Sequence, residues 1–238
     1  TKRLNACMKF IIKDLGVEAF LKLVEEEKKA LSCKSFEIDT TAFDGPIPEP
    51  LLVAPKVEID DLEAFEAWKK SNVIQQKQAG YVAIGIKVLV GDFYTDKARL
   101  LADLIKNYGA NELRFSLRQD ILIRNIKEDN LVFFYQELKK LDFVALGYNS
   151  TADITACPGT DTCNLGIASS TGIATELERV LAVEYPQYAN NQEIVIKISG
   201  CMNACGQHNM AEIGFQGMSV NSGKLVAPGL QVLLGGGN

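Results

Sequence analysis

Hydrophobic positions near the start of the chain recur every three to four residues, as they do on one face of an amphipathic helix. This pattern predicts a single helix over residues 4–31. Three of the seven prolines then fall within residues 46–50, and because proline disfavours helix on its N-terminal side, we expect a linker there. A short helix is predicted over residues 60–70, where it carries Trp68, the only tryptophan.

The hydrophobic period changes to two at residue 81, which is typical of a β-strand. From here the pattern predicts a strand, a helix, two strands and a helix, over residues 81–90, 95–108, 113–117, 121–126 and 129–140. We expect Thr95 to cap the first of these helices and Gly109 to end it. The order β-α-β-β-α makes up most of a ferredoxin-like unit, and one further edge strand is expected near Phe143.

Small and polar residues dominate from residue 149 onward, and they surround two pairs of cysteines. A helix over residues 171–182 and a strand over residues 194–198 are predicted between the two pairs. The second pair is therefore expected where this strand ends and a further helix begins. Small residues around paired cysteines suggest a site where the backbone approaches a bulky group closely.

Composition and charge exclude several classes of function. Of the 238 residues, 47% are hydrophobic, and the net charge is −5, so we expect no nucleic-acid partner. The longest apolar stretch, residues 81–90, is interrupted by Lys87 and is shorter than the roughly 20 residues of a membrane span, so we expect no membrane association. The first segment also lacks the pattern of a cleavable signal, and we expect a cytoplasmic protein.

The chain holds six cysteines: Cys7, Cys33, Cys157, Cys163, Cys201 and Cys205. Three disulfides are an alternative, but that framework belongs to short secreted chains with poor cores. Cys7 and Cys33 are remote from the two pairs, and we interpret them as small buried hydrophobic residues.

The spacing of the other four cysteines suggests a sulfur-ligated metal site. Five residues separate Cys157 from Cys163, and three separate Cys201 from Cys205. Zinc prefers closer pairs, whereas a [4Fe–4S] cube takes its ligands from more widely separated directions, which a long loop pair and a helical pair would suit. Glycines beside the cysteines would let the backbone approach the cube, and backbone N–H groups after Gly200 could point at sulfur: Gly159, Gly166, Gly200 and Gly206. A structural zinc or free thiols remain the alternative.

These residues resemble the signature of the siroheme and [4Fe–4S] nitrite and sulfite reductase family. The resemblance lies in Cys157-Pro158-Gly159 with Cys163, in residues 199–207 around the second pair, and in residues 211–215. The stretch Leu113-Arg114-Phe115-Ser116-Leu117-Arg118-Gln119-Asp120 also looks like the family's ferredoxin-like half-domain motif. The resemblance covers roughly residues 80–238 and implies an α+β chain, in which a ferredoxin-like half-domain precedes an α/β siroheme/[4Fe–4S]-binding domain.

The resemblance implies an oxidoreductase that reduces nitrite to ammonia, or sulfite to sulfide, with six electrons from a ferredoxin or flavoprotein. Its cofactors would be siroheme and a [4Fe–4S] cluster ligated by Cys157, Cys163, Cys201 and Cys205. Cys205 would also be the catalytic axial ligand that bridges the cluster to the siroheme iron. Asn203 is a candidate cofactor contact, with a local turn cap as its alternative. An electron-transfer module without siroheme and a structural zinc domain are the other function classes that we retain.

Several polar residues are candidates for binding the anionic substrate or delivering protons. For Arg114, Arg118 and Arg124 we favour a solvated strand face. For His208, the only histidine, we favour a hydrogen-bonded supporting role over proton donation. Lys197 could reach a carboxylate, but we interpret it as a strand-edge lysine.

Family members commonly carry two copies of the half-domain and cluster-domain pair, and only a second copy is recognisable here. We therefore expect residues 1–40 to be the helical tail of a preceding repeat, 41–78 a linker with a short helix, 79–147 the half-domain and 148–238 a cluster domain incomplete at its C-terminus. On this hypothesis the isolated chain is a fragment that is inactive and binds its cofactors weakly or not at all. A small reductase with one repeat is the alternative.

Overall fold

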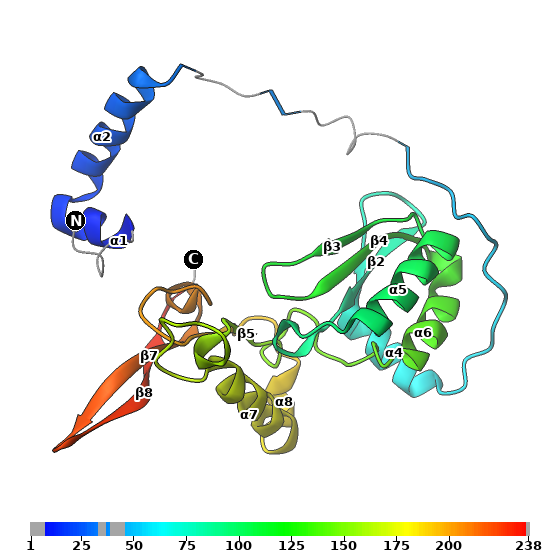
Figure 1. Cartoon of the computed structure of the whole chain (residues 1–238). Coiled ribbons are helices and arrows are strands. Elements are labelled where there is room, and N and C mark those ends of the chain that lie inside the picture. The colour runs from blue at the N-terminus through cyan, green and yellow to red at the C-terminus, as the bar shows by residue number, and fades with distance from the viewer. Residues whose placement is uncertain (1–7, 33–36, 39–45, 237–238) are drawn as a thin grey trace. The chain divides into compact units, whose positions relative to one another are not determined.

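The computed structural model describes residues 8–32, 37–38 and 46–236, and the chain divides into two compact units, residues 1–46 and 47–238 (Figure 1). The first unit contains helices α1 (Met8–Leu15) and α2 (Val17–Ala30). The single helix expected here is thus two helices, because Gly16 adopts a φ of 80° that interrupts helical geometry. Cys7 and Cys33 lie outside the described residues, so their interpretation as buried hydrophobic residues stays a prediction.

The second unit begins with an antiparallel sheet of four strands in the order β1-β2-β4-β3. Its strands and helices are, in chain order, α4 (Leu62–Asn72), β1 (Val73–Gln75), β2 (Tyr81–Ile86), α5 (Thr95–Tyr108), β3 (Leu113–Phe115), β4 (Ile121–Lys127) and α6 (Leu131–Lys140). The predicted order is confirmed, and Gly109 follows α5 as expected. Tyr94 rather than Thr95 is the N-terminal cap of α5, and its side chain makes no capping hydrogen bond.

The edge strand expected near Phe143 is instead supplied by β1, which pairs with β2 through Val73 and Ile84. Phe143 follows α6 as a core residue in a segment without strand structure. Helix α4 belongs to the same core, since Phe65 and Trp68 are buried with residues of the sheet. The segment expected as a linker with a short helix over 41–78 therefore contributes a helix and a strand to the half-domain.

The second sheet has the order β5-β6-β7-β8, in which β5, β6 and β7 are parallel and β8 is antiparallel to β7. Its elements are β5 (Thr155–Ala156), α7 (Ser170–Val183), α8 (Pro186–Ala189), β6 (Ile196–Ser199), β7 (Ile213–Ser222) and β8 (Leu225–Leu234). Helix α7 connects β5 to β6, and its Ala174 packs with Ile154 and Ile198 in a second small core. This parallel arrangement places the ends of β5 and β6 next to each other, and each end leads into one cysteine pair.

Candidate functional site

The first cysteine pair lies on the loop between β5 and α7. Cys157 directly follows β5, and a 3-10 turn over Gly159–Asp161 leads toward Cys163. The backbone N–H of Cys163 donates to the carbonyl of Gly159, at 3.1 Å. Gly159 adopts a φ of 55°, so glycine suits the sharp change of direction that this loop makes.

The second pair lies on the loop that follows β6, and this loop is not the helix that the sequence led us to expect. Residues 200–207 form successive turns, in which Ala204 and Gln207 have φ values of 61° and 59°. Left-handed residues at these positions are incompatible with a continuing α-helix. Cys201 and Cys205 are therefore presented by turns rather than by one helical face.

Backbone hydrogen bonds tie the two cysteine loops together. The N–H groups of Ile167 and Ala168 both donate to the carbonyl of Gly200, at 2.8 and 3.0 Å. The N–H of Gly200 in turn donates to the Cys157 sulfur, at 3.2 Å. A backbone N–H at Gly200 therefore points at a cysteine sulfur, that of Cys157. This N–H belongs to a turn and not, as we had expected, to the start of a helix.

The glycines around the cysteines allow the loops to pack closely against each other. A Cβ atom on Gly206 would collide with the carbonyl oxygen of Ile198, and one on Gly200 would lie 2.7 Å from the carbonyl oxygen of Ala168. A Cβ on Gly159 would collide with the Ser170 hydroxyl. In the structure these glycines allow close contact between protein segments, and their role in the approach to a bulky group stays a prediction.

The structure brings the four cysteine side chains to one place. Burial raises the pKa of the Cys205 thiol, and the nearby Cys157, Cys201 and Cys163 raise it further. Cys201 is buried, Cys157 is half-buried, and Cys163 and Cys205 are exposed. All four are free thiols, and two of them are open to the surface.

These four sulfurs fit the demands of a cube better than those of a single ion. Among the residues that the structure describes, no three His, Cys, Asp or Glu side chains gather as one metal ion requires. A [4Fe–4S] cluster takes one thiolate at each of its irons, so its ligands lie farther apart than those of one zinc ion. The N–H of Gly200 donates to the Cys157 sulfur, and such a hydrogen bond would stabilise this sulfur if it ligated a cluster.

The remaining candidate residues occupy different surroundings. Asn203 lies half-buried between the second pair of cysteines. His208 is 2% exposed, and its Nε2 forms a 3.1 Å hydrogen bond with Gln216, in agreement with the supporting role that we favoured. Lys197 is not a strand-edge residue, because β6 pairs on both sides, and its Nζ donates to the Gln207 side chain at 2.6 Å.

The three arginines differ from one another. Arg114 and Arg124 both pair with Glu112, at 2.9 and 3.1 Å, which fits the solvated strand face that we expected. Arg118 has a different partner: its side chain donates to the carbonyl of Ser150, at 3.3 Å. Arg118 is half-buried. Burial lowers the pKa of Lys197, and the charge of Arg118 lowers it further, so these two cations lie near each other close to the second cysteine loop.

Sequence reasoning missed two residues that support Cys157. Ser170, at the start of α7, has no exposed surface and contacts both the carbonyl and the sulfur of Cys157. Gln119, in the half-domain, forms two hydrogen bonds with the backbone of Ala156. Both contacts join residues far apart in the sequence, so no local sequence pattern predicts them. The one available signal is that Gln119 lies within the family-like motif of the half-domain.

A buried network of charges joins the half-domain to the cluster domain. Lys87, after β2, forms a 2.7 Å ion pair with Glu178 of α7, and both side chains are 11% exposed. Nearby, the carboxyl groups of Asp120 and Asp153 are both buried, and Oδ2 of Asp120 has no hydrogen-bond partner among the described residues. Burial, followed by the Asp153 carboxyl, raises the pKa of Asp120 to about 9.

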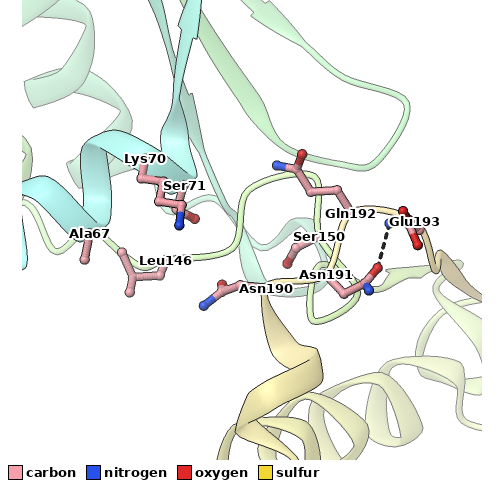
Figure 2. Close-up of a pocket in the computed structure, with 9 residues that line it drawn as sticks. All are labelled: Ala67, Lys70, Ser71, Leu146, Ser150, Asn190, Asn191, Gln192 and Glu193. Atoms are coloured by element: carbon pink, nitrogen blue, oxygen red, sulfur yellow. Dashed lines mark hydrogen bonds between the residues drawn. The ribbon is translucent and has the colours of Figure 1, made fainter.

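A cavity of about 640 Å³ lies apart from the cysteines. Figure 2 shows it between α4, which contributes Lys70 and Ser71, and the segment around Asn190 and Asn191. Most of the residues that line it are polar, and the N–H of Glu193 donates to the Asn191 side chain at 2.7 Å. No cysteine lines this cavity, so it is not the site that the cysteine pattern predicts. Among the described helices, none is long and apolar enough to span a membrane.

Two family models match the chain and together cover most of it. The nitrite/sulfite reductase ferredoxin-like half domain matches residues 74–141, and the nitrite and sulphite reductase 4Fe-4S domain matches residues 147–238. These are the two parts that the sequence led us to expect, and the α+β fold with two sheets agrees with them.

Named proteins similar to this chain include sulfite and nitrite reductases. Sulfite reductase [ferredoxin] 2 of Mycolicibacterium paratuberculosis is 28% identical over 98% of this chain, and ferredoxin–nitrite reductase of Synechococcus elongatus is 26% identical over 95%. The solved structure of the Mycobacterium tuberculosis NirA protein covers 99% of the chain, with a TM-score of 0.62 and 28% identity. The chain spans 39% of the length of each of these three proteins.

Proposed function

The chain belongs to the nitrite and sulfite reductase family, and from this premise we propose that it forms the cluster- and siroheme-binding part of such an enzyme. The reaction is the six-electron reduction of nitrite to ammonia or of sulfite to sulfide. The observation that carries the proposal is the convergence of two cysteine pairs at the ends of the parallel strands β5 and β6. Relatives with both kinds of name match the chain, and both substrates are small anions.

Cys157, Cys163, Cys201 and Cys205 would ligate the cluster. The parallel pairing of β5 with β6 sets the distance between the two loops, and the hydrogen bonds of Gly200 hold them in register. Burial, followed by the charges of the other three cysteines, raises the pKa of Cys205, so four thiolates at this place would need a cationic metal centre to balance them.

Cys205 would also be the axial ligand of siroheme, and its exposed position on the second loop leaves room for a macrocycle. When bound, siroheme would supply an iron centre for the anion, and the cluster would supply single electrons. Asn203 lies two residues before Cys205 on the same loop, so we propose it as a polar contact to the macrocycle. Arg118 and Lys197 are two neighbouring cations suited to carboxylates of the macrocycle.

We propose a ferredoxin as electron donor, with a flavoprotein as the alternative. The names of the sulfite and nitrite reductases that match the chain support the first choice, because they specify ferredoxin. A nucleic-acid partner is not part of the proposal, since the net charge is −5. A cytoplasmic location remains a prediction, and a similar nitrite reductase, from Spinacia oleracea, is named chloroplastic.

The proposal is tested on holoprotein produced anaerobically with a supply of siroheme. In the enzyme of which this chain forms part, we expect iron, acid-labile sulfide and an extractable green macrocycle, together with reduction of nitrite or sulfite by a chemical one-electron donor. Because Cys205 would hold both groups, the Cys205→Ser variant is expected to lose siroheme and activity together with cluster iron, whereas Cys201→Ser is expected to lose the cluster. Iron and sulfide without a macrocycle would favour the electron-transfer module, and zinc in place of iron would refute the proposal.

A further inference from the structure

The Ser170 hydroxyl lies at the point where the two cysteine loops meet. It has no exposed surface, and its Oγ donates to the Cys157 carbonyl at 2.6 Å. The same Oγ lies 3.4 Å from the Cys157 sulfur. A Cβ atom on Gly159 would collide with this hydroxyl, and one on Gly200 would lie 3.4 Å from it, so backbone from both loops surrounds it.

The direction of the contact between Ser170 and the sulfur depends on the protonation state of Cys157. As a thiol, Cys157 can donate its own proton to the serine oxygen while the serine donates to the carbonyl. As a ligand, Cys157 is a thiolate with no proton to give, so the hydroxyl is the only possible donor in this pair. A thiolate attracts a hydroxyl proton more strongly than a neutral carbonyl does, because charge-assisted hydrogen bonds are roughly twice as strong.

We propose that the Ser170 hydroxyl hydrogen-bonds the Cys157 thiolate and thereby raises the reduction potential of the cluster. The proposal rests on the proposed function, because it assumes that Cys157 ligates a [4Fe–4S] cluster. Reduction adds one negative charge to the cluster, and a donor aimed at a ligating sulfur stabilises the more negative state. Water cannot replace this donor easily, since Ser170 is fully buried.

Ser170 would act together with the N–H of Gly200, which already donates to the same sulfur at 3.2 Å. Only one of these two hydrogen-bond donors can be removed by a side-chain substitution. A side chain at position 200 would meet the backbone of Ala168 and Gly159, so the Gly200 contact is fixed by the fold. The Ser170 contact can be removed by deleting one oxygen atom.

The test is a one-electron redox titration of the cluster in the holoprotein, with Ser170→Ala compared against the unaltered protein. We expect the reduced-to-oxidised ratio at a fixed potential to fall several-fold in the variant, where tenfold corresponds to about 59 mV for one electron. Ser170→Thr keeps the hydroxyl and is expected to restore the original ratio.

Ser169→Ala is the matched control, because Ser169 precedes Ser170 but is exposed and accepts from the N–H of Gly172. It should lower the stability of α7 without moving the potential. Pulsed EPR of the reduced cluster in H₂O and D₂O gives a second readout, in which Ser170→Ala is expected to lose one exchangeable proton coupled to the cluster.

The possible failures are distinguishable. An intact cluster in Ser170→Ala with unchanged potential and unchanged proton couplings would overturn the role of Ser170 and leave the proposed function standing. Absence of any [4Fe–4S] signal from the unaltered holoprotein would overturn the proposed function, and the role of Ser170 with it.

Discussion

The side-chain amide of Gln119 pairs with the backbone of Ala156 in the manner of a neighbouring strand. Its Nε2 donates to the Ala156 carbonyl, and its Oε1 accepts from the Ala156 N–H, each at 2.9 Å. Gln119 lies in a turn of the half-domain with a φ of 74°, and Ala156 is the last residue of β5, next to Cys157. The half-domain therefore holds the strand that delivers the first cysteine.

Replacement of Gln119 by alanine is expected to destabilise the fold by about 1–3 kcal/mol, because it leaves a buried N–H and carbonyl of Ala156 without partners. Urea unfolding measures this loss. The exposed Gln192 provides the control, and Gln192→Ala is expected to stay within about 0.5 kcal/mol of the unaltered chain. Equal losses in the two variants would contradict the strand-like pairing.

The buried carboxyl pair predicts a dependence of stability on pH. Burial, followed by Asp153, raises the pKa of Asp120 from 3.8 to about 9, so the folded chain keeps a proton that the unfolded chain releases. The contribution of Asp120 to stability is therefore complete below the unfolded pKa and declines as pH rises toward 9, by up to about 1.4 kcal/mol per pH unit.

Asp120→Asn tests this prediction, because the amide cannot ionise and retains an oxygen for the N–H of Val88. We expect the stability of this variant to increase relative to the unaltered chain as pH is raised from about 5 to about 8 in urea titrations. Curves that run parallel over this range would show that the folded chain does not hold a proton on Asp120.

The ion pair between Lys87 and Glu178 predicts strong coupling between the half-domain and α7. Lys87→Met leaves the buried Glu178 without its counter-ion, and we expect a loss of about 3–5 kcal/mol. Replacing both residues by apolar ones should recover most of that loss, which a double-mutant cycle measures. The exposed pair of Lys97 with Asp142 is the control, with an expected coupling of about 0–1 kcal/mol. Similar coupling energies for the two pairs would count against the buried network.

Close packing at Gly206 predicts intolerance to the smallest side chain. A Cβ there would collide with the carbonyl oxygen of Ile198, so Gly206→Ala must displace β6 or the second cysteine loop. We expect a loss of cluster content together with reduced thermal stability. Gly223 is the control, since its Cβ would meet no atom within 4 Å, although its φ of 62° adds some strain. An alanine at 206 that retains full iron content would contradict this account of the loop.

Helices and strands with a clear hydrophobic periodicity could be predicted from the sequence. The errors occur where backbone conformation or strand pairing depends on more than the local hydrophobic pattern. Helix α5 spans the predicted residues because its apolar face and Gly109 both favour it. The helix expected over residues 4–31 breaks at Gly16, whose positive φ the period does not reveal. The edge strand expected near Phe143 is β1 instead, since strand pairing is decided by contacts distant in sequence.

The candidate site was also predicted only in part. Cysteine spacing alone indicated that two distant segments share a site, and the parallel pairing of β5 with β6 explains how they meet. The helix expected after Gly200 is absent, because turn residues such as Ala204 adopt positive φ. Ser170 and Gln119 could not be identified as supports of Cys157, since their partners lie 13 and 37 residues away in the sequence.

The convergence of the cysteines on one cube is tested most directly by Mössbauer spectroscopy of anaerobically prepared, ⁵⁷Fe-enriched holoprotein. We predict the spectrum of a single [4Fe–4S] cluster, with four cluster irons and four sulfides per chain beside the iron of siroheme, and we predict that the cluster signal is lost in the Cys201→Ser variant. A spectrum without a cube, or a sample that carries zinc at these cysteines instead of iron, would contradict the account.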